Sequence, residues 1–133
     1  MQTNISTATS TSLANENTQL LVVFYEKFQK RDPSLMDLMN DIFEFNGQEH
    51  PILRLEEITH SKMDFINWSK VYNQQFEHID ITPTKFEAED KGIVATLIVT
   101  FRNKSTGVVT TIPTLHHWRF KDGKASALRV TGI

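Results

Sequence analysis

The amino-acid sequence predicts an α+β fold in which helices pack on one face of a curved antiparallel sheet. Three observations support this class. A helical repeat of apolar side chains occupies residues 13–30, and a second helical repeat, made of aromatic residues, begins at Phe65. Residues 92–130 then alternate between apolar and polar types in three strands joined by two short turns. Helices followed by a run of strands are typical of α+β domains.

The first expected helix covers residues 13–30. Leu20, Phe24 and Phe28 recur at every fourth position, and Tyr25 lies beside them, so the helix has one broad apolar face. Basic residues crowd its C-terminal turn, where positive charge suits the helix dipole.

A short second helix and the first strand follow. Asp32 is suited to the N-cap of that helix and Pro33 to its first position. Residues 41–46 then switch to a period of two, and Gly47 ends the strand. Both sides of this strand carry apolar residues, so the pattern leaves its inward face open.

The third expected helix begins after Ser61, which acts as its N-cap. Its apolar face is a stripe of aromatic residues at offsets of three, four and four: Phe65, Trp68, Tyr72 and Phe76. Before it, residues 51–55 are compatible with a short strand or a loop.

Four strands complete the chain, and their links are typical of hairpins because Gly or Asn can adopt a positive φ there. The expected strands are residues 82–89, 92–103, 108–120 and 124–130. No linker or internal repeat divides the sequence. Residues 13–133 are therefore expected to form a single domain after a disordered leader at residues 1–12, which are rich in Thr, Ser, Asn and Ala.

Composition excludes several classes of function. The chain has 133 residues, no cysteine and a formal net charge of −2 with both signs interspersed. Disulfides and thiolate chemistry are therefore excluded, and no basic stripe indicates a nucleic-acid partner. The apolar runs are too short to span a membrane, and the N-terminus does not resemble a signal peptide, so we expect a cytoplasmic protein.

Three segments carry a family resemblance. Residues 24–32, the strand 41–45 and the stretch 117–124 (His-Trp-Arg-Phe-Lys-Asp-Gly-Lys) resemble the SnoaL-like branch of the nuclear transport factor 2-like superfamily, which includes ketosteroid isomerase and polyketide cyclases. The order and spacing of these segments carry the resemblance, which covers residues 15–131. It implies a cone, in which a strongly bent sheet wraps three helices around a pocket, and a homodimer formed through the outer face of the sheet.

The resemblance also implies positions for the site. The strand that places an acidic hydrogen-bond donor in the isomerase pocket matches the strand 108–120, and the donor falls on His116. Thr114, Trp118 and Phe120 then also face inward, whereas His117 faces outward. The neighbouring strands send further apolar side chains inward, namely Leu97, Val99, Phe101, Leu128 and Val130.

Two isomerase roles are vacant in this matching. The carboxylate base falls on Asn46, whose amide cannot accept a proton at neutral pH. The tyrosine that helps to hold the enolate oxygen falls on Phe24, with Tyr25 one position further. Steroid isomerase chemistry is therefore not expected unless the matching slips by one residue.

His116 is the predicted catalytic residue. Burial in an apolar pocket would keep its imidazole uncharged, so it could donate a hydrogen bond or act as a general acid or base. The alternative is a structural histidine whose ring is hydrogen-bonded to a neighbouring side chain or backbone group and takes no part in a reaction. The predicted ligand-binding residues are Asn46, Tyr25, Trp68, Tyr72, Leu97, Val99, Phe101, Thr114, Trp118 and Leu128. For the aromatic ones a purely structural role in the core is the alternative, and for Asn46 it is a strand-ending turn.

No metal or cofactor is expected. His50, His60 and His78 are scattered, and no pair has the four-residue helical spacing of a zinc site. His117 is expected on the outer face of the sheet, where it faces solvent or lies in a dimer contact.

Two hypotheses of function remain open. The first is a pocket protein that binds a small hydrophobic, carbonyl-bearing molecule and performs cofactor-independent isomerase, cyclase or dehydratase chemistry with His116 as acid or base. The second is a domain without catalysis that binds a ligand or dimerises. A cavity packed shut would favour assembly, whereas an open cavity with several polar groups would favour the first hypothesis.

Overall fold

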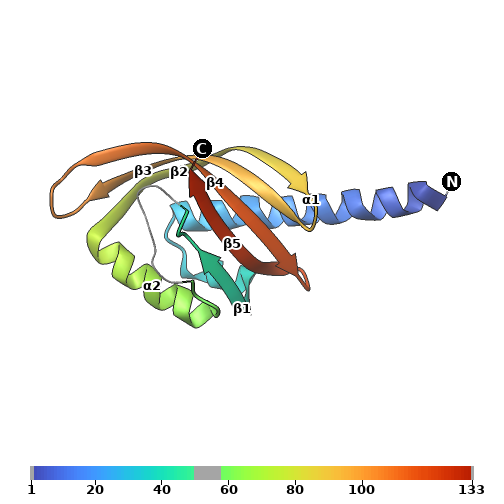
Figure 1. Cartoon of the computed structure of the whole chain (residues 1–133), viewed down its shortest axis with the longest axis horizontal. Coiled ribbons are helices and arrows are strands. Elements are labelled where there is room, and N and C mark those ends of the chain that lie inside the picture. Colours follow the sequence, from blue (N-terminus) through green and yellow to red (C-terminus); the bar gives the residue numbers. More distant parts are fainter. Residues whose placement is uncertain (1, 50–57, 133) are drawn as a thin grey trace.

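The computed structural model describes residues 2–49 and 58–132, with side chains from residue 14 onward, and has an α+β fold (Figure 1). Its elements in order are α1 (Gln2–Gln29), the 3₁₀ helix η1 (Pro33–Leu38), β1 (Met39–Asn46), α2 (Lys62–Gln75), β2 (Phe76–Glu89), β3 (Gly92–Asn103), β4 (Val109–Lys121) and β5 (Lys124–Gly132). The question of a strand or a loop at residues 51–55 lies outside the described residues.

The sheet is curled, with the helices on one side of it (Figure 1). It has five strands in the order β1-β5-β4-β3-β2. Strands β2 to β5 form the predicted antiparallel meander, but β1 pairs with β5 in parallel. The expectation of a wholly antiparallel sheet was therefore wrong at this edge. Parallel neighbours need a long connection, and here all the elements from α2 to β4 lie between the two strands.

Helix α1 begins at Gln2, so it includes the segment expected to be a disordered leader. Its N-terminal part extends beyond the sheet (Figure 1). It ends in a Schellman motif, because Arg31 N–H donates to Phe28 O and Asp32 N–H donates to Lys27 O. Arg31 occupies the left-handed position, with φ of 56°.

No helix in the described part of the chain is long and apolar enough to cross a membrane.

The predicted caps are present. The carboxylate of Asp32 accepts a hydrogen bond from Ser34 N–H at 2.9 Å and begins η1. Ser61 Oγ accepts from Asp64 N–H at 3.1 Å and begins α2. Phe76, the last residue of the predicted stripe, is both the C-cap of α2 and the first residue of β2, so this strand starts earlier than expected.

Three turns join the antiparallel strands. Asp122 and Gly123 both have a positive φ, as a two-residue type I′ hairpin requires. In the β2–β3 turn, Lys91 takes the positive φ instead of Gly92. Gly92 is required for another reason, since a Cβ there would lie 2.1 Å from the backbone oxygen of Trp118 on β4.

The inward faces of β3, β4 and β5 are as predicted. Thr114, His116 and Trp118 are buried on β4, whereas Arg119 is exposed. Leu97, Val99, Phe101, Leu128 and Val130 are also buried. The sequence left the inward face of β1 open. Phe43 and Phe45 are buried and form this face, so Asn46 points to the other side of the sheet.

Candidate functional site

An apolar cavity of about 130 Å³, here called the inner chamber, lies between the helices and the sheet. Aromatic residues of α1, α2 and β1 form one wall, and aliphatic and aromatic residues of β2 to β5 form the other. Its few polar groups include Thr114 and His116 on β4 and Tyr72 and His78 near the junction of α2 and β2. A largely apolar lining with few polar groups is typical of a small-molecule site.

His116 is held by a buried tyrosine. Tyr25 Oη lies 2.8 Å from His116 Nδ1, and Trp118 Nε1–H donates to the same oxygen at 2.8 Å. Trp118 can only donate, so one lone pair of the tyrosine oxygen is occupied. If His116 Nδ1 also donated, the Tyr25 proton would need a third partner, and the described part of the chain supplies none. The arrangement therefore favours Tyr25 donating to Nδ1.

This hydrogen-bond chain sets the tautomer of His116. With Nδ1 as acceptor, the neutral imidazole carries its proton on Nε2. Burial raises the pKa of the Tyr25 hydroxyl, and the hydrogen bond from Trp118 only partly offsets this effect. Tyr25 therefore stays protonated and remains a donor. In chemical terms, the neutral ring of His116 can donate a hydrogen bond from Nε2–H, whereas its Nδ1 already accepts one from Tyr25.

An outer chamber of about 350 Å³ adjoins the inner chamber. Both chambers are lined by Phe24, Phe28, Phe65, Ser69, Asn73 and His78. Charged residues of both signs line the outer one, namely Arg31, Asp32, Glu77 and Lys104. Its carboxylates have cationic neighbours, because Lys27 lies 3.5 Å from Asp32 and Arg102 lies 3.7 Å from Glu77. The outer chamber therefore has no strong preference for one sign of charge.

Tyr72 and His78 meet where the two chambers join. Their ring centroids are 5.3 Å apart. Tyr72 Oη and His78 Nδ1 are buried and have no hydrogen-bond partner in the described structure. Burial, with a smaller contribution from the nearby Arg31, lowers the pKa of His78 to about 4, so its ring is neutral at pH 7. Burial raises the pKa of Tyr72.

Most of the predicted site residues line the inner chamber, namely His116, Trp68, Tyr72, Val99, Phe101, Thr114 and Leu128. Four others do not: Tyr25, Asn46, Leu97 and Trp118. Tyr25 and Trp118 lie behind His116 and support it by the hydrogen bonds described above. Leu97 is fully buried in the core.

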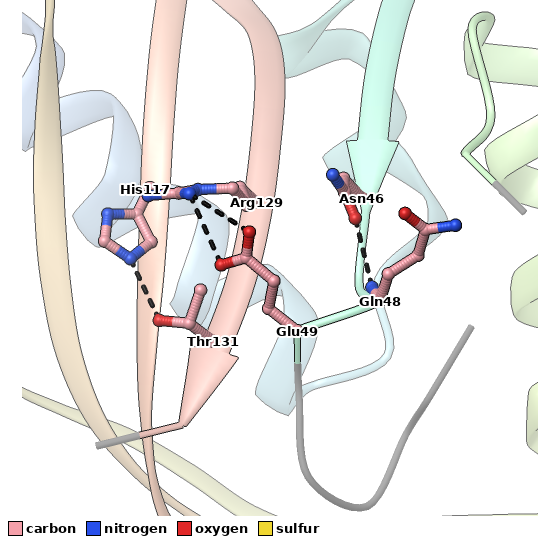
Figure 2. Close-up of polar contacts among 6 residues, drawn as sticks. All are labelled: Asn46, Gln48, Glu49, His117, Arg129 and Thr131. Carbon is pink, nitrogen blue, oxygen red and sulfur yellow. Dashed lines mark hydrogen bonds and ion pairs between the residues drawn. The ribbon is translucent and has the colours of Figure 1, made fainter. Parts of the chain in front are cut away.

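Asn46 is the clearest departure, because it faces the other side of the sheet. Its side-chain oxygen accepts a hydrogen bond from Gln48 N–H at 3.0 Å (Figure 2). This is the strand-ending turn that the sequence left as the alternative. On the same face, Arg129 pairs with Glu49 at 3.3 Å and His117 Nε2 lies 3.0 Å from Thr131 Oγ1 (Figure 2). Partial burial, then Arg129, lowers the pKa of His117, while Glu89 and Glu49 oppose this shift.

Sequence reasoning did not place His78, Ser69 or Asn73 in the site. His78 was expected to follow the third helix, and it lies on β2 because α2 passes directly into that strand. Ser69 directly follows Trp68, and Asn73 directly follows Tyr72. The aromatic stripe therefore already marked the part of the helix that carries these two polar residues. In the described part of the chain, no group of three or more His, Asp or Glu side chains is placed to hold a metal ion.

Solved structures show which fold this is. An NTF2-like protein of unknown function from Burkholderia pseudomallei superposes with a TM-score of 0.76 at 21% identity, over 89% of this chain and 91% of that one. TerC, co-crystallised with polyporic acid, gives 0.75 at 15% identity over 89% and 92%. A protein from Mesorhizobium loti, proposed to be a SnoaL-like polyketide cyclase, gives 0.67 at 15% identity over 85% and 96%.

These likenesses confirm the fold that the resemblance implied: the chain has the NTF2-like fold. No protein-family sequence model matches the chain, and no curated protein matches it in sequence.

The Tyr25→Phe variant should lower the free energy of unfolding by about 2 kcal/mol or more, because it leaves the buried Trp118 N–H and His116 Nδ1 without their shared partner. Tyr72→Phe is the matched control, since the lost hydroxyl has no partner, and it should change stability by less than about 1 kcal/mol. Urea unfolding measures both. Equal losses in the two variants would contradict the hydrogen-bond chain.

His78 should make stability depend on pH. Its folded pKa of about 4 lies below the ordinary 6.5. As pH falls from 6.5 towards 4, the unfolded chain binds a proton that the folded chain does not, so folding loses up to about 3 kcal/mol. The His78→Gln variant should lose less over this window. Denaturant titrations at pH 7, 5.5 and 4.5 measure the difference, and parallel curves for the two proteins would refute it.

Proposed function

We propose that this protein binds a small, mainly apolar molecule that carries a carbonyl group, and that the inner chamber is its binding site. One observation carries the proposal: His116, with its tautomer set by Tyr25, lines a mainly apolar cavity. In such surroundings a hydrogen bond from Nε2–H to a carbonyl oxygen is worth more than in water. The aromatic and aliphatic walls would hold the rest of the molecule.

Two likenesses support a ligand of this kind. TerC, which has the same fold, was co-crystallised with polyporic acid, a quinone with carbonyl oxygens. The Mesorhizobium loti protein is proposed to be a polyketide cyclase, and polyketides are rich in carbonyl groups. Both proteins are distant in sequence, so they support the class of ligand and not its identity.

We further propose that any catalysis is of the isomerase, cyclase or dehydratase type, without a cofactor. Nε2–H of His116 would polarise the carbonyl and stabilise negative charge as it develops on the oxygen. The geometry supports a role as hydrogen-bond donor, because Nδ1 is already the acceptor for Tyr25. None of the described residues that line the inner chamber is a carboxylate, so the chamber lacks the kind of base that the isomerase uses.

The alternative is a domain that binds a ligand or dimerises without catalysis. The lack of a carboxylate among the described lining residues favours it. So do exposed apolar side chains on the sheet, among them Ile98 at 47% and Val109 at 51% exposure. Ile98 lies between the buried Leu97 and Val99, so it faces away from the chamber. We propose that this outer face forms a homodimer.

The His116→Leu variant tests the binding proposal. It should bind 2-naphthaldehyde about 10-fold more weakly than the wild type, since one hydrogen bond is worth about 1.4 kcal/mol. The affinity for 2-methylnaphthalene, which has no oxygen, should be unchanged. Isothermal titration calorimetry measures both compounds. His117→Leu is the matched control, because this neighbour faces the other side of the sheet. Equal binding of the aldehyde by all three proteins would refute the role of His116.

The dimer is tested by sedimentation velocity at micromolar concentration. The wild type should sediment as a dimer and Ile98→Lys as a monomer, because a buried lysine at the interface carries a large desolvation cost. Met63→Lys on α2, where the methionine is 63% exposed, is the control and should remain dimeric. A monomeric wild type would contradict the proposed homodimer.

A further inference from the structure

Two buried polar atoms at the junction of the chambers take no part in the hydrogen-bond chain of His116. Tyr72 Oη and His78 Nδ1 lack hydrogen-bond partners in the described structure. Tyr72 is only 8% exposed and lines the inner chamber, and His78 lines both chambers. Buried polar groups in native proteins are nearly always paired, so an unpaired pair in one cavity wall points to a group that binds there.

The two side chains are held in place by their neighbours. Tyr72 stacks between Trp68 at 5.2 Å and Phe76 at 5.0 Å, measured between ring centroids. His78 lies edge-on against Phe28 at 5.2 Å. Because packing already fixes both rings, little conformational entropy would be lost when they bind a ligand. The junction is therefore preorganised for recognition.

The chemistry of the pair specifies what it can accept. Tyr72 is protonated and offers a donor, and the neutral imidazole of His78 offers one donor and one acceptor. Neither side chain carries charge at neutral pH. The charges that line the outer chamber are of both signs, so they do not favour an ion. A neutral hydroxyl or carbonyl oxygen fits this set of donors and acceptors.

We propose that Tyr72 and His78 form a second recognition point that binds a neutral oxygen function of the ligand. The ligand class is then narrower than a carbonyl-bearing apolar molecule. It has two oxygen functions separated by an apolar body, one directed to His116 and the other to the junction. This inference rests on the proposed function, because it places the same ligand in the inner chamber.

Matched pairs of aldehydes test the inference by isothermal titration calorimetry. The first pair is 2-naphthaldehyde and 6-hydroxy-2-naphthaldehyde, and the second, longer pair is biphenyl-4-carbaldehyde and 4′-hydroxybiphenyl-4-carbaldehyde. The titrations are run at pH 6, where both phenols are protonated. In at least one pair, the wild type should bind the hydroxylated member about 10-fold more tightly.

The Tyr72→Phe variant should abolish this gain while its affinity for the parent aldehyde changes by less than about 2-fold. His78→Leu should reduce the gain as well. The phenylalanine variant keeps the ring stack and removes only an unpaired hydroxyl, so it is expected to fold normally.

Each other outcome is decisive. If neither member of either pair binds, both this inference and the proposed function fail. If the parent aldehydes bind through His116 but hydroxylation brings no gain in either pair, only this inference fails. It also fails if Tyr72→Phe weakens both members of a pair equally, because the hydroxyl would then act through water or packing. A gain that survives in both variants would place the second oxygen elsewhere.

Discussion

The buried hydroxyl of Tyr25 is the interaction on which the rest of the site depends. It connects α1 to two positions of β4, because it contacts both His116 and Trp118 at 2.8 Å. These residues are two positions apart and therefore point to the same face of the strand. One oxygen atom thus fixes which face of β4 is inside and how close the helix lies to the sheet. Moving α1 along the sheet would break both of these buried hydrogen bonds.

The cavity changes in character along its length. The ring of His116 lies against Trp118, which packs edge to face on Phe24 with ring centroids 4.9 Å apart. The inner chamber is lined mainly by apolar side chains. Tyr72 and His78 follow at the junction, and charged residues appear only in the outer chamber. Polarity is therefore higher in the outer chamber, whereas the inner chamber has few polar side chains, among them Thr114 and His116.

Local signals in the sequence predicted much of this structure. The caps at Asp32 and Ser61 and the Asp122–Gly123 turn depend on neighbouring residues, and all were read correctly. The inward side of β4 was predicted from the family resemblance and is confirmed by the burial of Thr114, His116 and Trp118. The parallel edge strand was missed because it pairs residues that are far apart in the chain. Asn46 was misplaced because both sides of β1 carry apolar residues. The site tyrosine matched Phe24 by alignment, but the side chain that reaches His116 is Tyr25, since one residue on a helix rotates the side chain by about 100°.

The direct passage from α2 into β2 has a consequence for how this protein can vary. Phe76 ends the helix and begins the strand, with its N–H bonded to Tyr72 O and its backbone paired with Asn103. No residue in between can absorb a change in length. Inserting one residue here would rotate the helix face by about 100° and reverse the side chains of β2 as far as the register shift between His78 and Asp80. Substitutions at residues 72–78 can therefore alter the wall of the inner chamber without moving the helix, whereas a change in length between Tyr72 and His78 would turn the two side chains away from each other.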